Sequence, residues 1–195
     1  MHTLYSGDPK TVLDGPAITG GLASGKQAQM DLSATIILPS GRIYKYVKLG
    51  TEASVVATKG AAVYWTDLAC TTITTDQSDG IAPGLGGGCA GVWVRPTTTA
   101  ALQGFDSAHY AFIQVGGVAP CQSDGSVAAG DMIWANATDG IFMTAVSANT
   151  GVHYFICGVA VETDGTTATA GGELAAASGG ADNIASFYCR LSGLI

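Results

Sequence analysis

Residues Tyr110–Phe142 read YAFIQVGGVAPCQSDGSVAAGDMIWANATDGIF, and this stretch decides the fold of the chain. It predicts an apolar strand that ends at Gly116–Gly117, a short polar turn at Gln122–Gly125, a second apolar strand in MIWA, and a tight turn at Asp139–Gly140. Short apolar segments separated by Gly and Asp are typical of antiparallel sheets. We therefore expect an all-β protein, built as an antiparallel β-barrel or sandwich.

The same alternation of short strands and turns continues through most of the chain. Turn signals recur about every 8–12 residues, which is the spacing of a sandwich or barrel. Residues 81–88 and 164–183 are too rich in glycine to be strands throughout, so we expect long Gly-rich loops there. The predicted strands are Thr35–Leu38, Ile43–Leu49, Ser54–Ala57, Ala61–Trp65, Thr71–Thr74, Gly91–Arg95, Tyr110–Val115, Ala119–Gln122, Met132–Ala135, Ile141–Val146, Tyr154–Glu162 and Ile184–Leu191.

The beginning of the chain differs from the rest. It is rich in Gly and Pro and shows little periodicity, which indicates an extended N-terminal arm, residues 1–35, before a β-domain, residues 36–195. A flexible tail and an arm that orders on binding both fit this composition. For a binding arm, the candidate partner-contact residues are Leu4, Tyr5, Lys10, Val12, Leu13, Ile18 and Lys26.

Charge is scarce and unevenly distributed. Charged residues make up 12% of the chain, against about 25% in a typical globular protein. Either a compact small-residue core or a surface covered by other subunits explains this. Residues 1–60 hold six cations and four acids, a net charge of +2, whereas the remainder holds two cations and eleven acids, a net charge of −9, which together give −7. The acidic body disfavours nucleic acid as a partner. The N-terminal cations either dock on an acidic surface or only improve solubility. One of them, Lys45, is expected in a half-exposed strand.

Neither a membrane segment nor an exported protein is predicted. No run of about 18 apolar residues occurs, and MHTLYSGDPK lacks the basic and apolar regions of a signal peptide. We therefore expect no membrane partner and assembly in a cytoplasm. The five cysteines show no CxxC spacing, which argues against a structural zinc site. They are interpreted as buried reduced thiols that act as small hydrophobic residues.

Most motifs that suggest chemistry fail on inspection. Gly20–Gln27 matches a phosphate-binding loop except at its last position, where Gln27 replaces the magnesium-binding Ser or Thr. Asp76–Gly80 lacks the ligand register of a calcium loop. His109 and His153 precede predicted strands and, with Asp106, offer a weak metal or acid–base hypothesis. We therefore expect no enzyme activity and no cofactor.

Aromatic residues are a stronger indication of a functional surface than these motifs, because nearly all of them fall in predicted strands. Neighbouring side chains of a strand point to opposite faces. In the pairs Tyr64–Trp65, Tyr154–Phe155 and Phe187–Tyr188, one member is therefore a candidate for the outer face, where it would anchor a partner.

The pieces FIQVGG, VAAGDMIWA and TDG, in this strand order, resemble the barrel domain of tailed-phage head decoration proteins, also called capsid cement proteins. The resemblance covers most of the chain from about Ala34 onward. It implies a non-enzymatic virion structural protein, bound to the outer surface of a phage capsid, that stabilises the expanded head by bridging major-capsid subunits. It also implies a homotrimer, with the major capsid protein and itself as partners. The chain departs from small cement proteins in its arm and in the long loop before the last strand.

A different part of the virion is the alternative. This alternative is a trimeric tail-fibre or tail-tip β-domain that binds a host glycan. Exposure of Trp93 or Trp134 at the rim of a barrel would favour that function.

Overall fold

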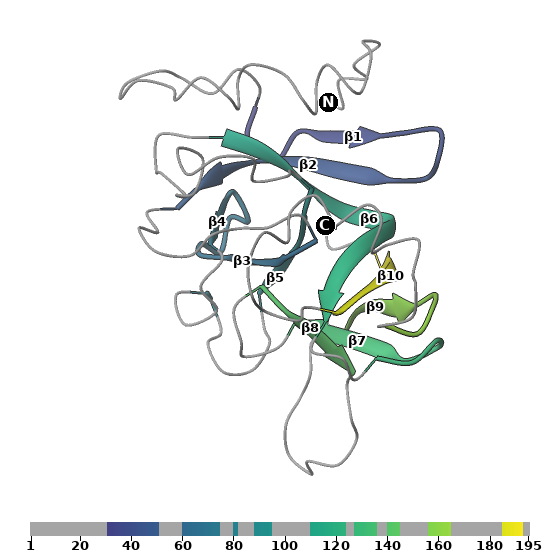
Figure 1. Cartoon of the computed structure of the whole chain (residues 1–195). Helices are drawn as coiled ribbons and strands as arrows, with labels where there is room; N and C mark the ends of the chain where they lie inside the picture. Colours follow the sequence, from purple (N-terminus) through teal and green to yellow (C-terminus); the bar gives the residue numbers. More distant parts are fainter. Residues whose placement is uncertain are drawn as a thin grey trace, which may run out of the picture.

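The computed structural model describes residues 31–50, 60–74, 80–81, 88–94, 110–123, 127–135, 140–144, 156–164 and 185–192. Within these ranges every regular element is a β-strand, so the predicted all-β class is confirmed (Figure 1). The strands are β1 (Thr35–Ile37), β2 (Ile43–Leu49), β3 (Ala62–Trp65), β4 (Thr72–Thr74), β5 (Cys89–Trp93), β6 (Tyr110–Ser123), β7 (Met132–Ala135), β8 (Phe142–Thr144), β9 (Ile156–Ala160) and β10 (Ala185–Ser192).

The strands form a small closed barrel that continues into a further sheet. They hydrogen-bond in the order β1-β2-β4-β3-β5-β6-β10-β9-β7-β8, and an additional pairing of β2 with β6 closes the barrel of β2, β4, β3, β5 and β6. The sheet then runs from β6 through β10, β9, β7 and β8, and returns to β6 where Ser123 pairs with Phe142. Most pairings are antiparallel, as predicted, but β2–β4 and β6–β8 are parallel.

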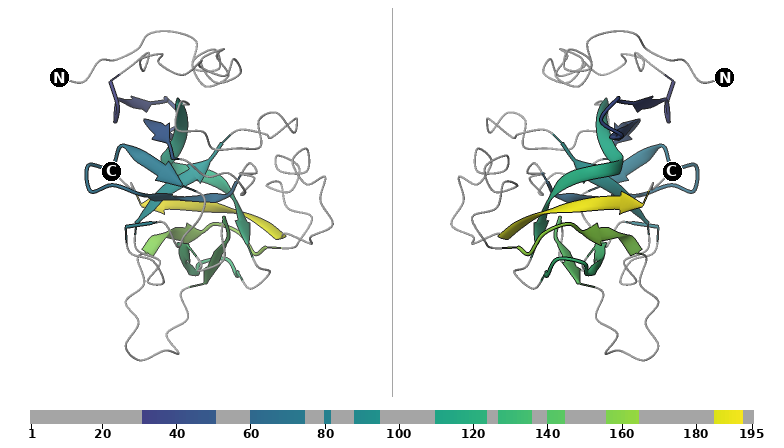
Figure 2. Two further views of the ribbon diagram at one scale, coloured as in Figure 1. Left: turned by 90° about the vertical axis from the view of Figure 1, so that its left-hand side faces the viewer. Right: turned by 90° about the vertical axis from the view of Figure 1, so that its right-hand side faces the viewer.

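Strand β6 belongs to both parts and corrects one prediction. The expected strand end at Gly116–Gly117 is wrong, because β6 runs unbroken from Tyr110 to Ser123. At these glycines β6 changes partners, since Gly116 pairs with Ile43 of β2 and with Ser192 of β10. Glycine inside a strand permits a bend and a close backbone approach, so the pair bends β6 rather than ending it. Figure 2 shows the resulting curvature.

The other strand limits follow the sequence closely. β2 and β7 have the predicted bounds, β1, β3 and β4 are each one residue shorter than predicted, and β5 begins and ends two residues earlier. β8 begins one residue later than predicted and β9 ends two residues earlier, while the predicted end of β8 and the predicted start of β9 lie outside the described residues. The predicted strand Ser54–Ala57 and most of the two Gly-rich segments lie outside the described residues. The expected boundary between arm and β-domain falls inside β1, which begins at Thr35.

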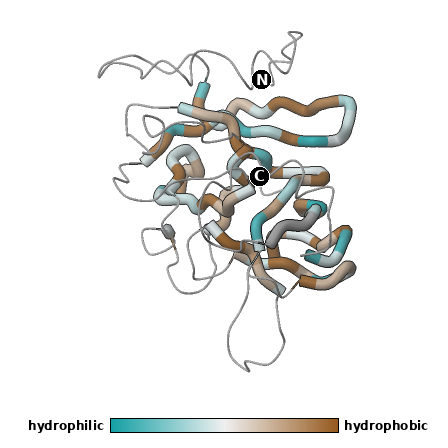
Figure 3. Tube along the Cα trace, viewed as in Figure 1, coloured by the Kyte–Doolittle hydropathy of each residue, from teal (hydrophilic) through white to brown (hydrophobic). Residues whose placement is uncertain are grey.

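One hydrophobic core spans both parts of the sheet. It includes Val47 of β2, Val63 of β3, Ile113 of β6, Ile133 of β7 and Leu191 of β10. Hydrophobic stretches accordingly recur along the strands of both parts in Figure 3. Burial of a Val or Ile side chain contributes about 1.5–3 kcal/mol, so this shared core ties the barrel to the additional sheet.

The core also contains a group of thiols. Cys89, Cys121, Cys157 and Cys189 are reduced and buried, which confirms their predicted role, whereas Cys70 is half-buried. A hydrogen bond with Cys157, together with burial, raises the pKa of Cys89 well above its usual value. Burial, together with a hydrogen bond with Cys189, does the same to the pKa of Cys121. The thiols of Cys89 and Cys121 therefore stay protonated and act as small apolar groups.

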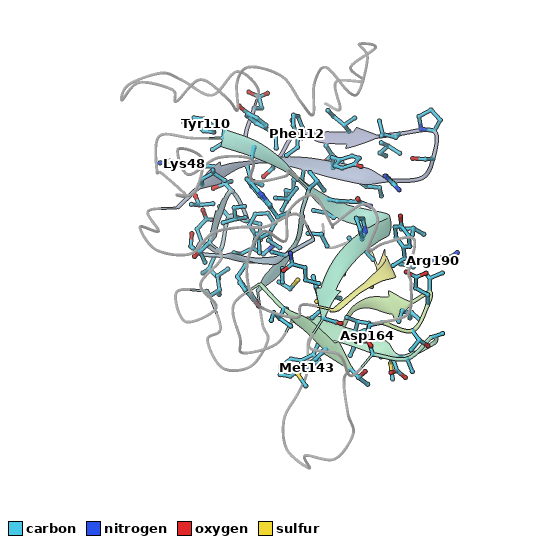
Figure 4. All side chains as sticks on the ribbon, viewed as in Figure 1. Lys48, Tyr110, Phe112, Met143, Asp164 and Arg190 are labelled. Atoms are coloured by element: carbon cyan, nitrogen blue, oxygen red, sulfur yellow. The ribbon has the colours of Figure 1, made fainter. Side chains whose placement is uncertain are left out.

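A buried carboxylate fixes the connection that leads from β6 to β7. Asp164 accepts hydrogen bonds from the hydroxyl of Ser123 and from the backbone N–H of Val127 (Figure 4). Its own backbone N–H donates to the carbonyl of Val127 at 3.0 Å. Asp164 thereby joins the end of β6 to the segment that follows β9.

Candidate interaction surface

A second, smaller hydrophobic cluster lies on the opposite side of β2 and β6 from the main core. Successive side chains of a strand alternate between its faces. Val47 and Ile113 enter the core, whereas Tyr44, Tyr46 and Phe112 form the second cluster. These three aromatic residues, which we call the outer aromatic cluster, are at most 4% exposed.

Ring contacts hold the outer aromatic cluster together. The rings of Tyr46 and Tyr110 stack with centroids 5.9 Å apart and an angle of 15° between their planes. The rings of Tyr46 and Phe112 are tilted by 51° with centroids 5.1 Å apart. Such pairs contribute about 0.5–1.5 kcal/mol each beyond their buried area. Tyr110 and Phe112 lie side by side on the first half of β6 (Figure 4).

The segment that follows the predicted arm is bound to this cluster. Leu32, Ala34, Ile36 and Leu38 pack against the aromatic rings. The backbone N–H of Ser33 donates to the carbonyl of Tyr46, and the N–H of Tyr46 donates to the carbonyl of Ala34, both at 2.8 Å. We call residues 31–38 the arm root. The chain therefore leaves the β-domain toward its N-terminus from a fixed point beside the outer aromatic cluster.

A turn from another part of the barrel supports the arm root. Ser33 has a φ of 70°, an uncommon value for a residue with a side chain. Its hydroxyl donates to the backbone carbonyl of Cys70, which itself has a φ of 53°. Such conformations persist where surrounding contacts determine them. The arm root and the β3–β4 turn thus hold each other in place.

The cations near the arm root are not equally available to a partner. Lys45 was expected in a half-exposed strand, but only 6% of it is exposed. Its side chain lies on the core face of β2, and its ammonium sits 4.8 Å from the centroid of the Trp65 ring. Arg42 and Lys48 remain half-buried. Lys45 is therefore a structural cation, and among the described cations of β2 and the turn before it, Arg42 and Lys48 are the ones that offer positive charge to a partner.

The candidate contact residues of the arm lie outside the described residues: Leu4, Tyr5, Lys10, Val12, Leu13, Ile18 and Lys26. The loop Gly20–Gln27 and the histidines also lie there. Among the residues that are described, no group of three or more His, Cys, Asp or Glu side chains is arranged to hold a metal ion. No helix in the described part is long and apolar enough to cross a membrane.

The expectation for paired aromatic residues fails at Tyr64–Trp65. Both are buried, because every residue of β3 is covered on both faces. Conversely, sequence reasoning did not find the exposed apolar residues of β7 and β9, Met132 and Val159. Their segments are apolar throughout, a pattern typical of strands buried on both faces, so the sequence held no signal of exposure.

Comparison with known proteins adds no relative, since no protein-family model and no curated protein matches this chain.

Proposed function

We propose that this chain is a non-enzymatic virion structural protein that binds the outer surface of a phage capsid. It stabilises the expanded head by bridging neighbouring major-capsid subunits, and it acts as a homotrimer. Its partners are the major capsid protein and other copies of itself, with no nucleic acid and no membrane. It is assembled in the host cytoplasm and ends in the virion.

The arm root is the observation that carries this proposal. Ser33 and Ala34 bond to the backbone of Tyr46, and the side chains around them pack on the outer aromatic cluster. An N-terminal segment of 30 residues thus starts from a fixed point on a barrel. This combination suits a bridging protein, because the barrel can rest on one subunit while residues 1–30 reach the next.

The physics of a lattice suits a chain with few charges. Each copy needs only modest affinity when many copies bind one particle and each copy has more than one contact. A segment that orders on binding loses conformational entropy at that moment, so its contacts form only where the capsid offers a complete site. Expansion of the head would create such sites.

The test uses expanded heads purified without this protein and then mixed with the full chain. We expect density on the outer face between capsomers by cryo-electron microscopy. A variant lacking residues 1–30 should keep its fold, because the strands and the arm root remain, but it should lose head binding. A second variant, with Ser at Leu4, Tyr5, Val12, Leu13 and Ile18, should also lose binding. Bare heads incubated with intact, folded full-length protein would contradict the proposal.

The glycan-binding alternative relied on exposed tryptophans. Trp93 and Trp134 are only 7% and 8% exposed, so neither offers a flat surface on which a sugar ring could stack. Binding of the full chain to a glycan array, without binding to heads, would nevertheless move the tail-fibre function to first place.

A further inference from the structure

The outer face of β7, β9 and β10 carries a row of exposed side chains. Met132 lies opposite Val159, and Val159 lies opposite Arg190, so the three side chains share one face. Met132 is 57% exposed, Val159 is 43% exposed, and Val161, two residues farther on, is 52% exposed. We call Met132, Val159, Val161 and Arg190 the Val159 row. It is an apolar surface with the guanidinium of Arg190 at one end.

The charge in this row is unusual for its part of the chain. Arg190 is the only Lys or Arg after Arg95. It is exposed, and it forms no ion pair with any residue in the described part of the chain. Its side chain extends away from the sheet (Figure 4). A partner surface that presents an apolar side chain beside a carboxylate would therefore bind the Val159 row best, because it matches both the apolar residues and the charge of Arg190.

The turn between β3 and β4 presents such a pair. Leu68 is 88% exposed, more than any other large apolar side chain in the described part of the chain. Next to it, the Asp67 carboxylate accepts hydrogen bonds from the backbone N–H of Thr71 at 2.9 Å and from its hydroxyl at 2.8 Å. We call residues 67–71 the Leu68 turn.

The Leu68 turn is charged and preorganised. Burial by itself would raise the pKa of Asp67, but hydrogen bonds from Thr71 and Thr72 outweigh it and lower that pKa. The carboxylate is therefore ionised at neutral pH. The bonds to Thr71, and that of the Ser33 hydroxyl to the Cys70 carbonyl, hold the turn in one shape. A preorganised contact loses less entropy when it binds.

We infer that the Leu68 turn of one copy docks on the Val159 row of the next copy, with Asp67 facing Arg190. The inference rests on the self-association proposed above and names its two surfaces. The turn belongs to the β3–β4 connection and the row to β7, β9 and β10, so the two copies contribute different surfaces, and Asp67 meets Arg190 only where a turn docks on a row. The contact is therefore head-to-tail, and such contacts form a closed ring when the rotation closes.

The test measures the mass of the full chain in solution by light scattering and sedimentation velocity. We expect the wild type to form oligomers. Leu68→Asp and Val159→Asp should each raise the dissociation constant about 30-fold or more, because each places a charge at the centre of the contact. A mixture of these two variants should form a dimer and nothing larger, since only one intact turn and one intact row remain to pair.

Controls separate this contact from misfolding and from other surfaces. Ser40→Asp adds a charge at an exposed position between β1 and β2, outside the arm root and both docking surfaces, and should leave the oligomer intact. Met132→Asp repeats the Val159 test at a second position of the row. If Val159→Asp and Met132→Asp both leave the wild-type oligomer unchanged, the inference fails although self-association stands. If Leu68→Asp has no effect while Val159→Asp does, the row has another occupant. A full chain that is monomeric at every concentration would overturn both the inference and the proposed trimer, but not head binding.

Discussion

Substitution of Gly117 by Ala tests why β6 bends. Gly117 has a φ of +78° and lies where β6 leaves β2 for β10. A Cβ added there would lie 2.6 Å from the carbonyl oxygen of Gly41 and 2.9 Å from the Cα of Arg42. Both atoms belong to the backbone of the β1–β2 hairpin. They cannot turn aside as the end of a flexible side chain would, so the hairpin or β6 must shift.

The expected loss of stability has two parts. A side chain in the left-handed region costs about 1–2 kcal/mol. Overpacking against fixed neighbours typically costs a further ~1–3 kcal/mol. Gly117→Ala should therefore lower the free energy of unfolding by about 2–5 kcal/mol, a large share of the roughly 5–15 kcal/mol of a typical domain.

Gly41→Ala is the matched control. Gly41 has a φ of +79°, but nothing lies within 4 Å of the position of its added Cβ. It should lose only the backbone part, about 1–2 kcal/mol. The difference between the two variants therefore isolates the crowding at Gly117.

The assay is equilibrium unfolding in urea, followed by the fluorescence of the buried tryptophans Trp65, Trp93 and Trp134. Equal losses in Gly117→Ala and Gly41→Ala would refute the close approach of β6 to the hairpin. No loss in either variant would also refute the backbone account of the bend.

Two further predictions concern buried groups. Asp164→Ala should lower the free energy of unfolding by about 2–4 kcal/mol, because Val127 loses the carboxylate as its acceptor and Ser123 loses its bond to the same group. Asp164→Asn keeps an acceptor oxygen and should therefore lose less stability. A urea midpoint of Asp164→Ala equal to that of the wild type would contradict this role. The pKa values of Cys89 and Cys121 are raised in the folded protein, so their contribution to stability is complete below the ordinary thiol pKa of about 8.5. Above that pH the unfolded chain loses these protons first, and the free energy of unfolding falls as the pH rises toward the folded-state pKa values. The folding equilibrium constant should fall by up to about tenfold per pH unit for each thiol. Urea midpoints measured across this range should fall less steeply in a variant with Ala at both positions, and parallel curves would count against the thiols as the cause.

The sequence predicted local strand character well. In IYKYVKL and MIWA, aromatic and β-branched residues between turn signals favour strands, and β2 and β7 have the expected limits. Glycine at position 140 also has the positive φ, +73°, that suits the predicted tight turn. Strand limits and tight turns depend on residues that are neighbours along the chain, so they can be predicted from a single sequence.

The candidate surfaces were harder to predict. The sequence indicated an N-terminal arm and aromatic residues that could form an interaction surface, but it did not show that the two lie side by side. Tyr46 meets the arm root only because β1 pairs with β2, and it meets Phe112 only because β2 pairs with β6. Exposure of Val159 follows likewise from its position between Met132 and Arg190 at the outer face of a sheet.

The sequence by itself determined the all-β class, most strand positions and the burial of four cysteines, because strand propensity, turn chemistry and hydrophobicity act locally or through composition. Only the tertiary structure decided whether Gly116–Gly117 ends a strand or bends it. A glycine pair breaks a strand that has no partners beyond it, but here β2 and β10 supply hydrogen bonds on either side of the bend. Those partners lie some 70 residues away on each side in the sequence, and no local pattern specifies which of them β6 will meet.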